Sequence, residues 1–248
     1  MTATEEAASA TARVATERAT TTAANMGAMP DTRAVNFYDA DPHLRFLLRR
    51  RLSPSELAQG EPLLRTLGAR LGNEIEDLSA EADRHTPQLI SRNKRGERID
   101  EIAPSRAYRE MERIFYCEYG LAAMTPRPGV VDPNGPSSMP LNDALAYLSE
   151  QVESGLFCPL SMTRALARTL LKYAAPELVA RYVPRLTATD AEHLYTGAMF
   201  MTEKQGGSDL GITQTTARRS SARAEMWELR GEKWFCSNVA ADVILTLA

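Results

Sequence analysis

The spacing of the apolar residues changes at about Leu194, and this change constrains the fold more than any other feature of the chain. Before it, apolar residues recur at steps of three and four, as on one face of an α-helix. After it, short apolar runs are separated by turn residues, as in β-strands. The sequence therefore predicts an α+β fold, with an N-terminal all-α helical domain over 31–193 and the first part of an antiparallel β-barrel or β-sandwich domain over 194–248.

The first predicted helix carries a clear start signal. Ser53 is followed by Pro54 and, three residues on, by Glu56, which matches a capping box with proline at the first helical position. The face expected to be buried consists of apolar residues in helical phase: Leu64, Leu67, Leu71, Ile75 and Leu78. This spacing predicts one helix packed on a core.

Four more helices are expected in the first block. They begin at Ser105, near Asn142 and after Cys158-Pro159, and the last spans Pro176 to Tyr182. Two stretches, His85–Pro104 and 125–140, are expected to be irregular because prolines interrupt them.

Five strands are expected in the second block. The predicted ranges are Leu194–Met201, Ile212–Arg218, Glu225–Arg230, Lys233–Cys236 and Asp242–Ala248. In the third of them Trp227 and Leu229 alternate with polar neighbours, the pattern of a half-buried strand.

The run MTEKQGGSDL, from Met201 to Leu210, follows the first predicted strand and is the strongest functional signal. Glycine lets a backbone approach a ligand closely, and the hydroxyls of Thr202 and Ser208 can bond to ring or phosphate oxygens. A strand that ends in such a loop suits a phosphate-bearing cofactor. The alternative is an ordinary turn between strands, because Gly, Ser and Asp also form turns.

A second segment, GEKWFCSN from Gly231 to Asn238, favours the cofactor interpretation. Together the two segments resemble the acyl-CoA dehydrogenase superfamily, in which a TEP-x-x-GSD-like loop precedes a K-x-W-I-T-N-like strand. The loop MTEKQGGSD is most similar to the AidB-like branch, the adaptive-response-to-alkylation flavoproteins, and the segment QVESGLFCPLSMT also resembles that branch. The chain departs from most family members at Lys204, Gln205, Phe235 and Ser237.

The resemblance implies an FAD site in which the loop holds the cofactor and the second segment places a ring and a hydroxyl against the isoalloxazine. The positions that match are Met199, Met201, Thr202, Gly207, Ser208, Phe235 and Ser237. Ser208 also matches a position near the acyl-CoA pantetheine, so it is expected to contact substrate. Phe235 keeps a stacking surface but lacks the indole N–H of the family tryptophan. The structural alternative for each position is a packed or turn residue.

The resemblance also implies which parts of a whole family member lie outside this chain. The family's catalytic glutamate, much of its FAD contact surface and its oligomer interface come from a C-terminal helical domain, which is missing here, and the intact family protein is expected to be a homo-oligomer. No catalytic residue is therefore expected among these residues. Glu203 occupies the ordinary glutamate position of the loop and is not predicted to be the base. DNA binding in the AidB-like branch is likewise associated with the absent C-terminal region.

Composition excludes several classes of function. The formal net charge is −3, which does not favour nucleic-acid binding. The three histidines show no metal-ligand spacing, so no metal is expected. The three cysteines form no disulfide framework, which is typical of a protein of the reducing cytoplasm, so a cytoplasmic location is expected. No run is long enough to cross a membrane. Residues 1–30 are rich in Ala and Thr and are expected to form a disordered tail.

Three hypotheses about function remain open at this point. The first is an FAD-dependent oxidoreductase of the acyl-CoA dehydrogenase type, acting on CH–CH groups of acyl-CoA thioesters and present here as an N-terminal fragment. The second is a flavin- and DNA-binding protein of the alkylation response with little turnover. The third is an inactive remnant that binds no flavin.

Overall fold

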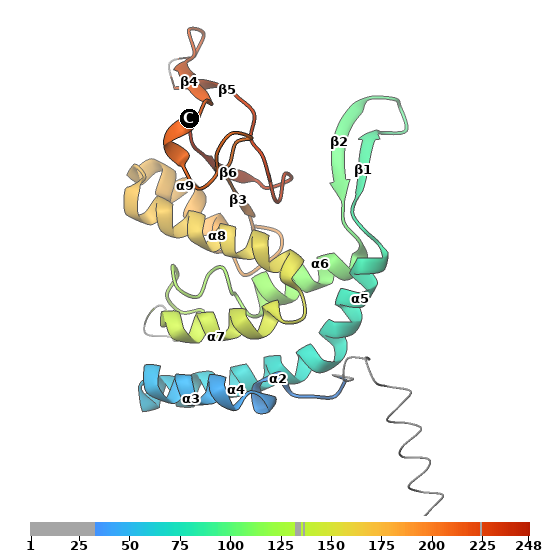
Figure 1. Cartoon of the computed structure of the whole chain (residues 1–248), viewed down its shortest axis with the longest axis vertical. Helices are drawn as coiled ribbons and strands as arrows, with labels where there is room; N and C mark the ends of the chain where they lie inside the picture. Colours follow the sequence, from blue (N-terminus) through green and yellow to red (C-terminus); the bar gives the residue numbers. More distant parts are fainter. Residues whose placement is uncertain (1–32, 132–134, 136, 224) are drawn as a thin grey trace, which may run out of the picture. The chain divides into compact units, whose positions relative to one another are not determined.

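The computed structural model describes residues 33–131, 135, 137–223 and 225–248. The tail expected over 1–30 lies outside these residues. Residues 34–248 form one compact unit, and everything described below belongs to it. Figure 1 shows the path of the chain through this unit.

The first two-thirds of the described chain are mainly helical, as expected. The helices are α2 (Phe37–Ala40), α3 (Pro42–Arg51), α4 (Pro54–Arg70), α5 (Glu76–Arg84), α6 (Arg106–Glu112), α7 (Met139–Glu150), α8 (Ser154–Tyr173) and α9 (Pro176–Leu186). Two π-helical segments, η1 (Leu71–Ile75) and η2 (Arg113–Glu118), continue α4 and α6.

The start and the buried face of α4 confirm the prediction. The Ser53 backbone N–H donates to the Glu56 carboxylate at 2.8 Å, and the Glu56 N–H donates to the Ser53 hydroxyl at 3.3 Å, which closes the capping box. Leu64, Leu67 and the two apolar residues of η1 are fully buried. They form one core with the apolar faces of α3, α6 and α7. Burying this face stabilises the helices more than local propensity does.

Helix α8 begins at Ser154, earlier than predicted, so Pro159 lies inside the helix and not before it. Pro159 is the sixth residue of α8, so the helix lacks one backbone hydrogen bond at this position. Glu153 caps the helix by accepting the Leu156 N–H at 3.1 Å. Helix α9 also continues four residues beyond the predicted end at Tyr182, to Leu186.

The stretch His85–Pro104 is not irregular, so that prediction was wrong. It contains an antiparallel hairpin of β1 (Gln88–Arg92) and β2 (Arg98–Ala103). In Figure 1 this hairpin projects from the ends of α5 and α6. The turn is held by the Asn93 side chain, which accepts the N–H groups of Arg95 and Glu97. Both faces of β1 are exposed, so its residues show no alternation that a period-two search could detect.

The described residues of the second block form four short strands rather than five. They are β3 (Gly197–Phe200), β4 (Thr216–Arg219), β5 (Trp227–Arg230) and β6 (Val243–Thr246), with a 3-10 turn, η3, over Leu210–Ile212. Strands β4 and β5 pair antiparallel, as expected. Every residue of β5 is exposed, so the half-buried pattern inferred from Trp227 and Leu229 was wrong.

Two further details of this block differ from the prediction. Strands β3 and β6 pair in parallel, with Gly197 opposite Val243, because the intervening residues 201–242 cross over between them. The segment Lys233–Cys236 is not a strand. Phe235 has φ 58° and Asn238 has φ 55°, and these left-handed conformations interrupt an extended run.

No helix in the described ranges is both long and apolar enough to span a bilayer. All three cysteines carry free thiols. Across the described residues, no group of three His, Cys, Asp or Glu side chains is arranged to hold a metal ion.

Candidate functional site

The loop that carries the main motif is positioned by the contact between β3 and α8. The buried Gly197 N–H donates to the Thr163 hydroxyl at 2.8 Å, and Thr163 is itself fully buried in α8. A Cβ at position 197 would lie 3.0 Å from the Thr163 Cα, so glycine lets the strand approach the helix this closely. Strand β3 is therefore held at a fixed place on the helical core, and this fixes where the loop that begins at Met201 starts.

The loop itself is a tight turn. The backbones of Glu203 and Gly206 exchange two hydrogen bonds, of 2.8 and 3.1 Å. A Cβ at Gly207 would lie 3.0 Å from the Thr202 Cγ2, so the second glycine lets the chain fold back against the threonine. Asp209 then accepts the Gly211 N–H at 2.9 Å and starts η3. The adjacent glycines are thus used for close packing within the loop.

Glu203 is the centre of a hydrogen-bond network that fixes this loop. Its side chain is buried, and its two oxygens accept five hydrogen bonds. The donors are the Lys233 ammonium at 2.7 Å, the Thr215 hydroxyl at 2.6 Å and N–H at 3.0 Å, the Gln214 N–H at 2.7 Å and the Gln205 amide at 2.6 Å.

These bonds hold the pKa of the Glu203 carboxyl far below its usual range, chiefly through the hydrogen bond from Lys233 and then that from Thr215. The carboxylate is therefore ionised and saturated with donors. A general base needs a pKa closer to the working pH and a free lone pair toward its substrate. Glu203 has neither property, so it is not suited to act as the base.

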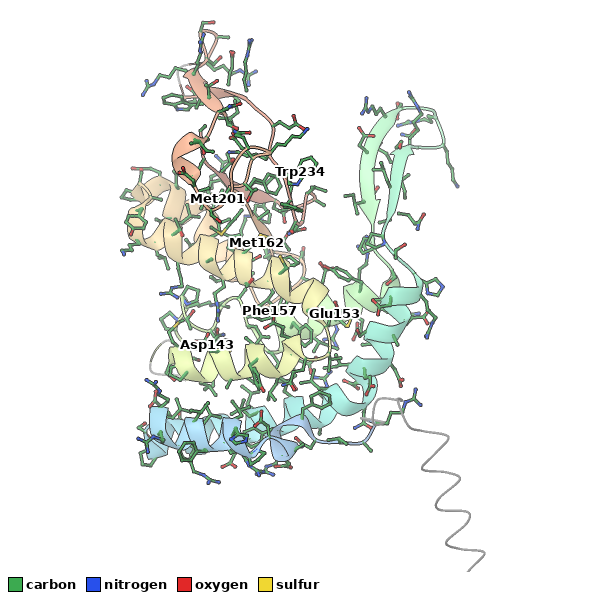
Figure 2. The ribbon with its side chains drawn as sticks, viewed as in Figure 1. Asp143, Glu153, Phe157, Met162, Met201 and Trp234 are labelled. Carbon is green, nitrogen blue, oxygen red and sulfur yellow. The ribbon has the colours of Figure 1, made fainter. Side chains whose placement is uncertain are left out.

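The second motif segment is tied to the first by the same network. Lys233 also approaches the Met201 carbonyl, at 3.4 Å, and the Trp234 N–H donates to the Thr202 carbonyl at 2.9 Å. Further along, the Asn238 amide donates to the Gly197 carbonyl at 3.3 Å. The two segments are thus neighbours in space although about thirty residues separate them in the sequence. Figure 2 shows Met201 and Trp234 in the β region that packs on α8.

The side chains of the seven candidate FAD residues differ in exposure. Met199, Met201 and Thr202 are half-buried, whereas Gly207, Ser208, Phe235 and Ser237 are exposed. The Phe235 side chain is 81% exposed and meets the Trp234 ring edge-on, with centroids 5.8 Å apart. Within the described residues, the hydroxyls of Thr202, Ser208 and Ser237 have no hydrogen-bond partner.

An exposed aromatic ring and three hydroxyls without partners fit a planar ligand with a polar edge. The ring offers a stacking face, and the hydroxyls can each donate one hydrogen bond and accept others. The residues present therefore fit a flavin, which has both features. The FAD contacts remain a prediction for each of the seven positions.

Sequence reasoning missed the residues that hold the site together. The half-buried Lys233 and the buried Thr215 are partners of Glu203, yet neither was proposed as a functional position. The sequence held a weak signal, because both motifs contain acidic and basic residues, among them Glu203 in the loop and Lys233 in GEKWFCSN. Gly231 is needed as well, since a Cβ there would lie 2.7 Å from the Thr215 Cα.

Comparison with protein families gives two adjoining matches. Residues 7–193 match the family model of the adaptive response protein AidB N-terminal domain. Residues 198–248 match that of the acyl-CoA dehydrogenase middle domain.

Individual relatives agree with these matches. The chain is 32% identical over 218 residues to acyl-CoA dehydrogenase family member 11 of Caenorhabditis elegans, covering 86% of this chain and 34% of the relative. It is 29% identical over 197 residues to the putative acyl-CoA dehydrogenase AidB of Escherichia coli K12, covering 75% of this chain and 35% of the relative. The chain thus spans about a third of the length of these curated relatives.

Solved structures show the same fold. The structure of C. elegans ACDH-11 in complex with C11-CoA superposes with a TM-score of 0.74 at 30% identity, covering 89% of this chain and 37% of that one. The apo form of Bd2924 gives a TM-score of 0.73 at 28% identity, covering 86% of this chain and 42% of that one. The chain therefore belongs to the acyl-CoA dehydrogenase family, within its AidB-like branch.

Proposed function

We propose that this chain forms one wall of an FAD site and takes part in the oxidation of CH–CH groups in acyl-CoA thioesters. The observation that carries the proposal is the Glu203–Lys233 ion pair of 2.7 Å, which clamps the two motif segments together. A buried ion pair with further hydrogen bonds fixes geometry more than it adds stability. A fixed wall is what cofactor binding requires, because a mobile loop would lose entropy on binding.

The residues of the wall have separate roles in this proposal. Phe235 stacks against the ring system, and Ser237 and Thr202 donate hydrogen bonds to its polar edge. Ser208 and the backbone beside Gly207 contact the cofactor further along the loop, and Met199 and Met201 supply apolar contact from the end of β3. When bound, FAD would accept a hydride from the substrate. The protein's contribution to such chemistry is orientation and electrostatics.

The substrate part of the proposal is supported by relatives rather than by this chain's own contacts. The structure of ACDH-11 contains C11-CoA, and its fold over the shared region matches this chain. Ser208 is the residue for which we propose contact with an acyl-CoA, since it is exposed at the end of the clamped loop.

The test is the reduction of bound flavin by a thioester. The purified protein is combined with a separately supplied polypeptide that carries the C-terminal helical domain of a family member and is loaded with FAD without oxygen. The visible absorbance of oxidised flavin is then followed as decanoyl-CoA is added. The proposal expects bleaching that reverses when an artificial electron acceptor is supplied, with free CoA as the inert control. Bound flavin that no acyl-CoA bleaches would refute the oxidation step.

A second candidate function is flavin binding within the response to DNA alkylation, with little turnover. The match of residues 7–193 to the AidB N-terminal family is the observation that favours it. The same experiment separates the two, because this alternative expects bound FAD that stays oxidised in the presence of acyl-CoA.

A further inference from the structure

A cavity lies beside the GEKWFCSN segment. It measures about 410 Å³ and is bounded by the base of the β1–β2 hairpin, by α6 and by the residues that follow the segment. Cys236 and Asn238 line it, and these residues alternate with Phe235 and Ser237. Its volume is within the range of small-molecule sites, which is roughly 300–1,000 Å³.

Helix α6 lines this cavity with Arg109, Tyr108 and Glu112, of which Tyr108 and Glu112 are the less exposed. Tyr108 and Glu112 are four residues apart, so they lie one turn above the other, and both line the cavity. Both side chains are half-buried. Burial raises the pKa of the Glu112 carboxyl, and the charge of Arg109 opposes that rise only in part. Burial also raises the pKa of the Tyr108 hydroxyl, to which the Glu112 charge adds.

Neither polar group has a side-chain hydrogen bond or ion pair within the described part of the chain. The preceding acidic residue of α6 shows the usual arrangement, since Glu110 is paired with Arg113 at 2.8 Å. Partly buried polar groups in proteins are usually satisfied by a protein, water or ligand partner. The Glu112 carboxyl and the Tyr108 hydroxyl can therefore both form hydrogen bonds with a molecule bound in this cavity.

We propose that this cavity binds a small organic group that is neutral, bears a hydroxyl or an amide, and is attached to an apolar chain. The hydroxyl or amide bonds to Tyr108 and Glu112, while Ile102 and Val239 contact the apolar part. A neutral group is favoured over an anion, since Arg109 is exposed and its charge is screened, whereas the Glu112 carboxyl is nearer the interior. The proposal does not depend on the FAD assignment.

The native Cys236 thiol provides a test, because it lines the cavity and can capture disulfide probes. The probes are mixed disulfides of cysteamine with a hydroxypropyl, a butyl or a carboxyethyl thiol. The Cys236 thiolate attacks the probe, the fragment becomes linked through a new S–S bond, and cysteamine leaves as the free thiol. Peptide mass spectrometry measures occupancy at each cysteine in FAD-free protein. The exposed Cys158 is the internal control.

The expected result is that Cys236 captures the hydroxypropyl probe roughly fivefold more than the butyl probe, the effect of one net hydrogen bond. Cys158 should show no such preference. Glu112→Leu and Tyr108→Phe should bring the ratio of hydroxypropyl to butyl capture at Cys236 toward one. Glu112→Gln keeps the shape and a hydrogen bond, so it should keep the wild-type ratio. Equal capture by the wild type, a ratio unchanged in both variants, or preference for the carboxyethyl probe would overturn the proposal.

Discussion

The contact between α8 and β3 gives the most direct test of how the helical region positions the loop. We predict that Thr163→Val lowers the free energy of unfolding by about 2 kcal/mol, because it leaves the buried Gly197 N–H without its acceptor. Valine has nearly the same shape as threonine, so no large cavity is added. The Tyr116 hydroxyl, 3.3 Å from the Thr163 hydroxyl, also loses a partner.

The matched control lies in the same helix. The Thr169 hydroxyl donates to the Ala165 carbonyl at 2.8 Å, just as the Thr163 hydroxyl donates to the Pro159 carbonyl at 2.8 Å. Among the described residues Thr169 makes no further side-chain hydrogen bond, so Thr169→Val should change the free energy of unfolding by less than about 0.5 kcal/mol. Any intrinsic effect of valine on the helix is common to both variants.

The assay is urea unfolding followed by far-UV circular dichroism, with the slope of the transition checked for constancy. A change in midpoint at constant slope reports stability alone. If the two variants lose the same stability, the hydrogen bond to Gly197 does not fix β3 on α8, and the physical reasoning for the position of the loop fails.

Two further predictions concern the network around Glu203. Gly231→Ala should destabilise the protein by about 1–3 kcal/mol, because the added Cβ would meet the Thr215 backbone, and thermal unfolding measures this. The pKa of Glu203 is lowered on folding, so its stabilising bonds are present above the ordinary glutamate pKa of about 4.3 and are lost as the pH falls below it. Glu203→Gln should reduce the loss of unfolding free energy that urea unfolding measures between neutral and acid pH. Glu232→Gln, at an exposed neighbour of Lys233, should leave that loss unchanged. The same dependence of unfolding free energy on pH in both variants would contradict the role given to Glu203.

The helical part of the fold could be predicted well because its signals are local. The capping box at Ser53 needs only three residues, and the stripe from Leu64 to Ile75 is read directly from spacing. The β1–β2 hairpin was missed because neither face of β1 is buried, and a strand without a buried face shows no alternation.

The site was less predictable because its geometry depends on contacts between distant residues. The motif identified the loop and the GEKWFCSN segment, yet the strand expected over Lys233–Cys236 is absent, since Phe235 adopts a positive φ. That conformation is costly for an aromatic residue and depends on surrounding structure, which no local pattern encodes. The Glu203–Lys233 pair likewise joins residues thirty positions apart.

The measurement that tests the flavin wall most directly is an equilibrium titration of FAD, followed by quenching of flavin fluorescence. The wild type should bind FAD, and Ser208→Ala and Phe235→Leu should each weaken binding about three- to tenfold, the effect of one hydrogen bond or one stacking contact. Ser221→Ala and Trp227→Leu remove an exposed serine and an exposed aromatic ring elsewhere in the β region, and they should leave the affinity unchanged. Unaltered affinity in both site variants, or no binding by the wild type, would contradict a flavin site built from these two segments.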